Sequence, residues 1–178
     1  MDSINKQQPE ENRKDLQSGA AAEKIKELVA KAQSCFFCTA IKTGNPAATR
    51  PMSVQETDEQ GNLWFLSAAD SHKNAEIAAD SAVQLFFQGS PHSDFLALYG
   101  KATITTDKEK IKQLWNPLLK TWFTEGIDDP RITVIKVTPE DGYYWDTKHG
   151  MMIAFIKQVA GAVIGQTFDD SIEGTLKP

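Results

Sequence analysis

The stretch Leu63-Trp64-Phe65-Leu66-Ser67-Ala68-Ala69-Asp70-Ser71-His72-Lys73 decides how the fold is predicted, because an aromatic run changes here into a helix start. Residues 63–67 are typical of a strand. Ser71 can cap a helix over residues 72–79, since a hydroxyl there accepts hydrogen bonds from first-turn amides. Free amides and the positive end of the helix dipole both favour an anion. The stretch therefore predicts an anion-binding corner from Ser67 to Lys73.

The residues before this corner predict a helix and a hairpin. Apolar positions at helical spacing cover residues 20–33. Residues 35–41 and 47–56 are predicted strands on either side of a polar turn. We expect the second of these strands to pair with strand 63–67, which would form a meander.

The residues after the corner predict two more long strands. Residues 82–88 form the first and residues 95–106 the second, with Gly100 as a candidate bulge. Short connections between successive strands favour a closed or nearly closed barrel, because closure removes exposed strand edges. We therefore expect a mainly β fold, a barrel of six to seven antiparallel strands with peripheral helices.

The second half of the chain predicts one helix and two shorter strands. Asp107 can cap a helix that runs to Asn116, before Pro117 forces a kink or a new start. Strands are predicted at residues 131–138 and 143–146, and the Pro139-Glu140-Asp141-Gly142 sequence between them is predicted to be a turn.

Composition indicates a soluble globular domain. The 178 residues are 40% apolar and 24% charged, which is ordinary for such proteins. We assign residues 20–165 to one domain, with a flexible N-terminal tail at 1–19 and a C-terminal tail at 166–178. A formal net charge of -5 argues against nucleic acid as a partner, since phosphate backbones are bound by clustered Lys and Arg.

The sequence gives no indication of a membrane partner. Residues 1–15 are polar and lack the apolar core of a signal peptide, so we expect a cytoplasmic protein. The longest apolar run, Met151 to Ile164, is interrupted by polar residues and is shorter than the ~20 residues that span a bilayer. We expect it to be a packed helix.

Cys35 and Cys38 form a CxxC pair, which is a spacing also found in redox and zinc sites. The surrounding sequence favours a strand, in which positions i and i+3 point to opposite faces. No second CxxC or spaced His pair completes a zinc site. We interpret both as small apolar core residues.

Arg50 could join the corner formed by Ser67, Ser71 and Lys73, because it lies on the strand expected to pair with 63–67. A guanidinium binds phosphate through two parallel hydrogen bonds, and Lys73 adds a second charge. The alternative is that Arg50 and Lys73 are solvated surface charges and Ser71 an ordinary cap. From the residues alone both interpretations stay open.

The order of three segments resembles the FMN-binding segments of the pyridoxamine 5'-phosphate oxidase-like split barrels, and most closely their general stress protein 26 branch. The likeness runs from about Glu23 to Ile164. The segments are Arg50-Pro51-Met52-Ser53-Val54, Trp64-Phe65-Leu66-Ser67 and Ser71-His72-Lys73-Asn74.

The resemblance implies a split barrel that forms a homodimer, with FMN in a groove between the subunits. It places the FMN phosphate at Arg50, Ser67, Ser71 and Lys73. It extends the cofactor-binding set to Pro51, Met52, Ser53, Leu66, His72 and Trp145. Trp145 is the best candidate for a residue beside the flavin ring, by its position on the family's late strand, and it could act across the dimer.

The chain also departs from the family pattern. His72 replaces the middle arginine of the phosphate-binding element, and an unperturbed His is mostly uncharged at neutral pH. Gln55 stands where the oxidases have a lysine. The C-terminus lacks the Arg-Leu-His-type substrate motif, so oxidation of vitamin B6 is not expected.

Three classes of function remain. The first is a flavin-dependent oxidoreductase that uses NAD(P)H and a small electrophile, and the second a non-enzymatic FMN-binding protein that buffers or senses flavin under stress. The third is a split barrel that holds another ligand, such as FAD, haem or a deazaflavin, or that holds none and works through its surface. The only histidines for haem are His72, His92 and His149, and none has a persuasive context. No catalytic acid or base stands out.

Overall fold

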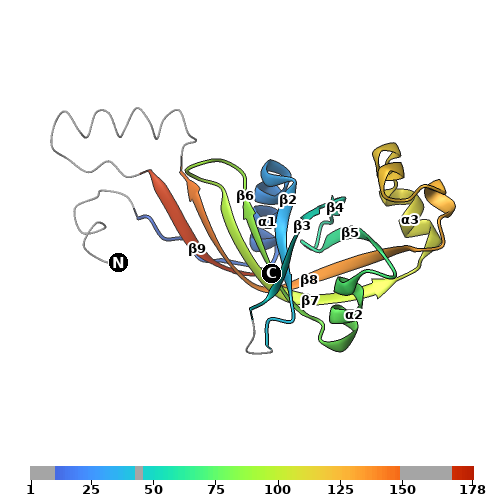
Figure 1. The fold of residues 1–178 in the computed structure, drawn as a ribbon. Helices are drawn as coiled ribbons and strands as arrows, with labels where there is room; N and C mark the ends of the chain where they lie inside the picture. Colours follow the sequence, from blue (N-terminus) through green and yellow to red (C-terminus); the bar gives the residue numbers. More distant parts are fainter. Residues whose placement is uncertain (1–10, 43–45, 149–169) are drawn as a thin grey trace.

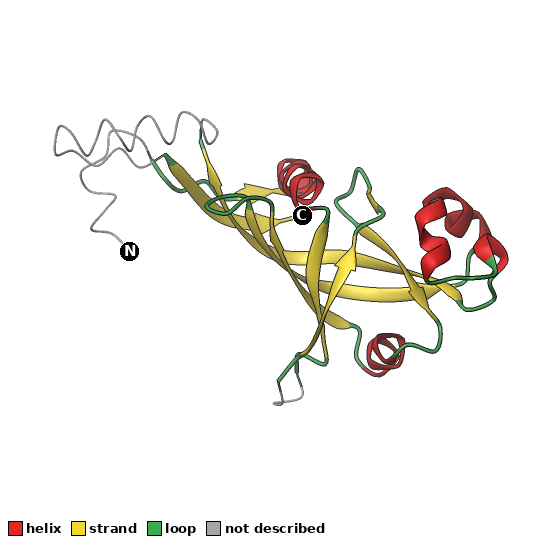
Figure 2. Cartoon of the chain, turned by 45° about the horizontal axis from the view of Figure 1, so that its top comes forward, coloured by secondary structure: helices red, strands yellow, loops and turns green. Residues whose placement is uncertain are grey.

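A computed structural model describes residues 11–42, 46–148 and 170–178. The strands form a single twisted sheet (Figure 1), and the helices lie outside it (Figure 2). The helices are α1 (Ser18–Ala32), α2 (His72–Ala79) and α3 (Lys108–Leu114), with short 3-10 turns η2 (Pro117–Thr121) and η3 (Gly126–Asp128). The strands are β1 (Leu16–Gln17), β2 (Ser34–Thr39), β3 (Ala48–Ser53), β4 (Glu56–Thr57), β5 (Leu63–Ala68), β6 (Ala82–Gln88), β7 (Phe95–Thr105), β8 (Ile132–Thr147) and β9 (Ser171–Lys177).

Strand β8 is the centre of the sheet because β5, β7 and β9 all pair with it. From β8 the ladder continues through β7, β6 and β2 to β3. After β3 the chain continues into β4. Strand β4 pairs with β5, and β5 pairs with β8. This circuit is a nearly closed barrel, which confirms the expected mainly β architecture with peripheral helices.

Helix α1 closes the main core. Its buried residues Ala21, Ile25, Leu28 and Val29 recur at helical spacing and pack against inward-facing residues of the sheet. Phe37 and Phe65, from β2 and β5, meet edge to face there, with ring centroids 5.3 Å apart. The expected helix and the β2–β3 hairpin are both confirmed.

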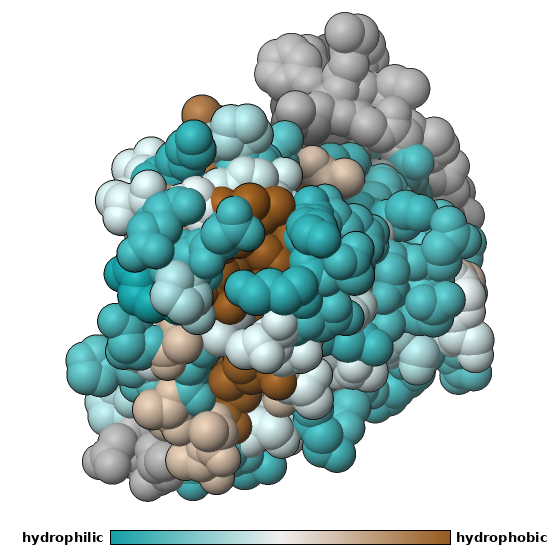
Figure 3. Space-filling view, turned by 90° about the vertical axis from the view of Figure 1, so that its right-hand side faces the viewer, coloured by the Kyte–Doolittle hydropathy of each residue, from teal (hydrophilic) through white to brown (hydrophobic). Residues whose placement is uncertain are grey.

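A second, smaller core lies at the end of the molecule that carries α3. Ile111 and Leu114 of α3 pack with Phe123 onto Leu66 of β5 and the start of β8. Asp107 caps α3 as expected, through bonds from the amides of Glu109 and Lys110. The helix ends at Leu114, and Asn116 caps η2 instead. The surface on this side is mostly hydrophilic, with small hydrophobic areas between the polar residues (Figure 3).

The turn expected at residues 139–142 is wrong, because β8 is one continuous strand of 16 residues. Proline and glycine there mark a bulge and not a reversal. Tyr99 pairs with Asp141 and Gly100 with Pro139, so Glu140 is the extra residue. The predicted bulge at Gly100 is confirmed. A Cβ at Gly100 would lie 2.3 Å from the Thr138 carbonyl oxygen, so the close approach requires glycine.

The expected pairing of strand 47–56 with strand 63–67 is also wrong over most of its length. Residues 48–53 pair with β2, and only Glu56 and Thr57 pair with β5. The other neighbour of β5 is β8, far along the chain. A meander, in which successive strands pair, is the simplest arrangement of the predicted strands and would place β3 beside β5. In the barrel, β8 lies beside β5 instead.

Described residues near each end of the sequence take part in the sheet. β9 pairs with the second half of β8, and β1 lies parallel to β9. Both strands lie in segments that the sequence predicts to be tails, at 1–19 and 166–178. The helix predicted for Met151 to Ile164 lies outside the described residues. Residues 43–45, which make up most of the turn predicted from Lys42 to Asn45, also lie outside them.

The two cysteines are buried free thiols, as expected. Cys35 belongs to the main core, whereas the Sγ of Cys38 lies 3.3 Å from the Thr49 hydroxyl on β3. Burial, with a contribution from Cys38, raises the pKa of the Cys35 thiol to about 12. A thiol with so high a pKa is unreactive at neutral pH, which argues against a redox role.

Candidate functional site

Helix α2 begins directly after the corner that the sequence predicts to bind an anion. Its residues, His72 to Ala79, are those predicted, and Ser71 occupies the N-cap position. The Ser71 side chain makes no capping hydrogen bond, so that part of the prediction is wrong. His72 is exposed in the first turn. The Asn74 amide already donates to the Ser71 carbonyl at 3.0 Å, so the amides of His72 and Lys73 are those that an anion at this helix start could use.

A buried hydrogen-bond network holds this corner, and its centre is Asn74. The Asn74 Oδ1 accepts from the Ser67 hydroxyl at 2.8 Å and from the Ser71 hydroxyl at 3.2 Å. Its Nδ2 donates to the Thr133 hydroxyl at 2.9 Å, which in turn donates to the Ser67 carbonyl at 2.9 Å. The network therefore ties the first turn of α2 to β5 and β8.

Lys73 and Arg50 bring two positive charges to the same corner. Lys73 Nζ lies 3.4 Å from the Ser71 hydroxyl. Burial lowers the pKa of Lys73, and the nearby charge of Arg50 lowers it further. Arg50 NH1 donates to the Glu76 carboxylate at 2.7 Å and to the Thr39 hydroxyl at 2.9 Å. The structure thus brings Arg50, Ser67, Ser71 and Lys73 together, although Arg50 comes from β3, which does not pair with β5.

The other residues predicted on β3 divide between the two faces of the strand. Arg50 and Met52 are half-buried, and Met52 packs against the main core. Pro51 and Ser53 are exposed on the opposite face. Leu66 is buried in the second core, under α3. Leu66 and Met52 therefore belong to the two hydrophobic cores and not to the polar groups of the corner.

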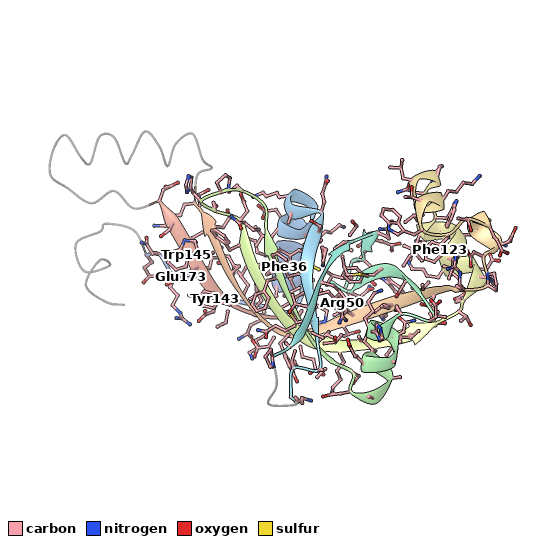
Figure 4. All side chains as sticks on the ribbon, in the orientation of Figure 1. Phe36, Arg50, Phe123, Tyr143, Trp145 and Glu173 are labelled. Carbon is pink, nitrogen blue, oxygen red and sulfur yellow. The ribbon has the colours of Figure 1, made fainter. Side chains whose placement is uncertain are left out.

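Pro51 faces a different feature, an apolar pocket on the outer face of the sheet. The pocket has a volume of about 650 Å³ and six aromatic residues in its wall. They are Phe36, Phe86, Phe87, Phe95, Tyr143 and Trp145. Phe36 is 61% exposed and Trp145 39%, so the wall is open to solvent in this chain. Figure 4 shows Tyr143 and Trp145 together with Glu173 at the end of the sheet away from Phe123.

Trp145 and the corner are far apart within one chain. Thr133 bonds to Ser67 and Asn74. Trp145 lies twelve positions further along the same strand, β8. At about 3.3 Å per residue this separation is up to roughly 40 Å. The structure therefore does not bring Trp145 to the predicted phosphate-binding residues of its own chain.

Asn74 and Thr133 belong to the corner, and Glu76 is the partner of Arg50. None of these three roles was predicted from the sequence. The signal for Asn74 was present, because an amide three residues after a cap can bond back to it. Thr133 and Glu76 had no comparable signal, since one comes from a distant strand and the other from an ordinary helical position.

The described part of the chain holds no group of three His, Cys, Asp or Glu side chains that could hold a metal ion. It also has no helix long and apolar enough to cross a membrane.

Solved structures confirm the fold. A candidate general stress protein 26 from Jannaschia sp. CCS1 superposes with a TM-score of 0.74 at 22% identity, covering 88% of this chain and 97% of that one. The general stress protein 26 of Bacillus anthracis superposes at 0.59 with 22% identity, covering 69% and 92%. The general stress FMN/FAD binding protein of Xanthomonas citri superposes at 0.58 with 20% identity, covering 68% and 84%.

Sequence comparison agrees with the structural likeness. Protein bli-3 of Neurospora crassa is 30% identical over 105 residues, which are 54% of this chain and 50% of that protein, so the match spans about half of each. The family model described as pyridoxamine 5'-phosphate oxidase like matches residues 20–169. The match covers most of the sequence and includes both the corner and the aromatic pocket, and the chain therefore belongs to the pyridoxamine 5'-phosphate oxidase like family.

Proposed function

We propose that this protein binds FMN, with the phosphate at the start of α2 between Lys73 and Arg50. The observation that carries the proposal is that these two cations meet at the start of α2, where Lys73 Nζ lies 3.4 Å from the Ser71 hydroxyl and Arg50 NH1 lies 2.7 Å from the Glu76 carboxylate. A phosphate placed between them would offset their repulsion, and the first-turn amides of α2 would donate to its oxygens. The donor set therefore fits a singly phosphorylated ligand.

The flavin ring needs a flat apolar surface, and the aromatic pocket has a suitable size. Pro51 in the pocket wall and Arg50 at the corner are neighbours on β3 whose side chains point to opposite faces. Trp145 lies twelve positions along β8 from Thr133. To reach both Arg50 and Trp145 of one subunit, a molecule of FMN would have to pass from one face of the sheet to the other. We therefore propose a homodimer, in which the phosphate is held by one subunit and the ring lies against Trp145 of the other. The exposed aromatic residues of the sheet face support this arrangement.

The bound flavin would supply hydride chemistry, so no catalytic side chain is required of the protein. We propose a cytoplasmic oxidoreductase of the general stress type that passes electrons from NAD(P)H to a small electrophile. The second candidate is a non-enzymatic FMN-binding protein that buffers or senses flavin. It is favoured by the Arg50–Glu76 ion pair, in which the carboxylate nearest the two cations is engaged with a guanidinium and is not poised as an acid or base.

The absorption spectrum of the purified protein, followed by mass measurement of the molecule released by heat or acid, tests the cofactor. A flavin spectrum with the mass of FMN is expected. A haem or deazaflavin spectrum, or no added FMN bound at micromolar protein, would overturn the proposal.

Turnover separates the two candidates once FMN is bound. NADH or NADPH is added anaerobically and bleaching of the flavin is followed, and then candidate acceptors are added. Bleaching and acceptor-dependent recovery support the oxidoreductase. If reduced nicotinamide never bleaches the flavin and no acceptor speeds reoxidation of chemically reduced protein, the buffering role is favoured.

A further inference from the structure

The aromatic pocket has a negative charge at its edge and no positive charge among its lining residues. No Lys or Arg is among the residues that line it. Trp145 lies between Phe95 on β7 and Glu173 on β9, because these three residues are direct cross-strand partners. Cross-strand partners point to the same face of a sheet. Glu173 is therefore at the edge of the pocket, beside the Trp145 ring (Figure 4).

Tyr143 fixes the carboxylate of Glu173 in this position. Its hydroxyl donates to Glu173 Oε2, and Tyr143 itself lines the pocket. Burial and the neighbouring Glu173 raise the pKa of Tyr143 to about 12, so the phenol stays protonated and donating at neutral pH. The pair thus presents a negative charge and no positive one to a molecule in the pocket.

Arg13 is a cation close enough to this pair to act on the pKa of Tyr143. It forms a backbone bridge with Glu173, and its guanidinium is paired with Asp15 at 3.3 Å. Glu173, Arg13 and Asp15 together carry one net negative charge. The local balance at this edge of the pocket is therefore acidic.

We propose that the aromatic pocket is a subsite for a planar ring that is uncharged or cationic, and that Glu173 makes it reject anionic rings. The aromatic wall supplies stacking surfaces and attracts a cation through the ring faces. The carboxylate adds attraction for positive charge and repulsion for negative charge at short range.

For a flavoprotein this has a direct consequence, which rests on the proposed function. The oxidised flavin ring is uncharged, whereas the two-electron reduced ring is an anion at neutral pH. Negative charge near the ring therefore stabilises the oxidised form relative to the reduced form. The same charge would favour uncharged or cationic electrophiles over phosphorylated or carboxylate substrates.

The first experiment needs no flavin. Calorimetric titration at pH 7 compares three bicyclic probes: N-methylquinolinium as the cation, quinoline as the neutral ring and 2-naphthoate as the anion. We expect the cation to bind about tenfold more tightly than the anion, as for one charged contact. Glu173→Gln keeps the shape and the acceptor for Tyr143, and should reduce the preference to what the aromatic wall alone provides. Glu140→Gln, at an exposed position on β8, should retain the full preference.

Two further outcomes would overturn the proposal. One is equal binding of cation and anion by the unaltered protein, or a preference of undiminished size in Glu173→Gln. The other is undiminished binding of the cation by Trp145→Ala, or no binding of any probe, since either result removes the pocket as the site. Thermal denaturation of each variant checks that it is folded.

The second experiment measures the midpoint potential of bound FMN in the unaltered protein and in Glu173→Gln. We expect the potential to become more positive in the variant. An unchanged potential would show that Glu173 does not face the flavin ring. If the unaltered protein does not bind FMN, the proposed function fails, whereas the probe titrations still decide the charge preference of the pocket.

Discussion

Arg50 and Glu76 form an ion pair of 2.7 Å that joins strand β3 to helix α2, beside the first turn that would hold a phosphate. The Glu76 carboxylate also accepts from the Thr39 hydroxyl, and these bonds from Arg50 and Thr39 lower the pKa of Glu76. A carboxylate therefore already holds the guanidinium that the corner would offer to an anionic ligand. Substitution of the cations Lys73 and Arg50 should therefore affect FMN binding in the opposite direction to substitution of the Glu76 carboxylate.

Lys73→Ala and Arg50→Ala should each weaken FMN more than riboflavin, because both side chains act on the phosphate and riboflavin has none. We expect a loss of about tenfold or more for FMN, from one charge-assisted hydrogen bond. Fluorescence titration with both ligands measures the difference. Lys112→Ala, which removes an exposed charge on α3, is the matched control. Equal losses for FMN and riboflavin would show that these cations do not bind the phosphate.

Glu76→Gln should tighten FMN and leave riboflavin unchanged. The substitution removes a negative charge beside the phosphate and releases Arg50 from its ion pair. An effect of roughly 1 kcal/mol, about fivefold in affinity, is expected for a partly exposed pair. Glu109→Gln, which breaks an exposed pair on α3, should have no effect. Weaker FMN binding in Glu76→Gln would mean that Glu76 orients Arg50 and does not compete with the ligand.

His72→Arg should strengthen FMN at neutral pH, because it adds a permanent charge in the exposed first turn of α2. Titrations of FMN into the variant and the unaltered protein at pH 8 test this. Unchanged affinity at pH 8 would mean that the side chain points away from the ligand.

Asn74→Ala should destabilise the protein, because it leaves buried hydroxyl groups without their partner. Ser67, Asn74 and Thr133 are all nearly inaccessible to solvent, at 3%, 6% and 3% exposure. Each unsatisfied buried group costs about 1–3 kcal/mol. Urea unfolding should therefore show a loss of roughly 2 kcal/mol, compared with less than 1 kcal/mol for Asn116→Ala at the exposed start of η2. A loss no greater than that of the control would show that the network does not hold the corner.

Local signals in the sequence predicted most elements, and they failed where the structure depends on distant residues. Helix α2 and strand β6 match their predicted bounds, because cap residues and apolar alternation act over a few positions. The partner of β5 is a strand about 65 residues later, and no local pattern identifies it. For the same reason the strand at 171–177 was missed, since its partners are β8 and β1.

The corner shows the same limit at the level of single residues. Ser71 and Lys73 were predictable because they follow one another at a helix start. Arg50 was placed there for a wrong reason, a pairing of β3 with β5. It reaches the corner through contacts with Thr39 and Glu76. The position of Arg50 depends on how the barrel closes. The periodicity of apolar residues in the sequence does not predict that closure.

Asp146 is the buried neighbour of Trp145, and it anchors the end of β8 to α1. Its Oδ2 lies 2.5 Å from the Lys24 ammonium, and its Oδ1 accepts from the Ser93 hydroxyl at 3.1 Å and from the Thr147 amide at 2.7 Å. Burial alone would raise the pKa of Asp146, but these donors hold it below its ordinary value. Neighbours on a strand point to opposite faces, so this anchor on the inner face keeps Trp145 on the outer one.

Asp146→Asn should therefore cost roughly 3 kcal/mol of unfolding free energy at pH 7, because it leaves the Lys24 ammonium largely buried without its main partner. A carboxyl whose pKa is lowered on folding stabilises the protein above its unfolded pKa of about 4, and that contribution is lost as the pH falls through the folded pKa. The pKa of Lys24 is raised, so its contribution persists until the pH rises well above 10. The difference in stability between the unaltered protein and Asp146→Asn should be constant near neutral pH and shrink below pH 4. Denaturant unfolding across this range measures it, with Asp141→Asn, an exposed position on the same strand, as the control. A difference that stays constant down to pH 2 would show that the ion pair is not its source.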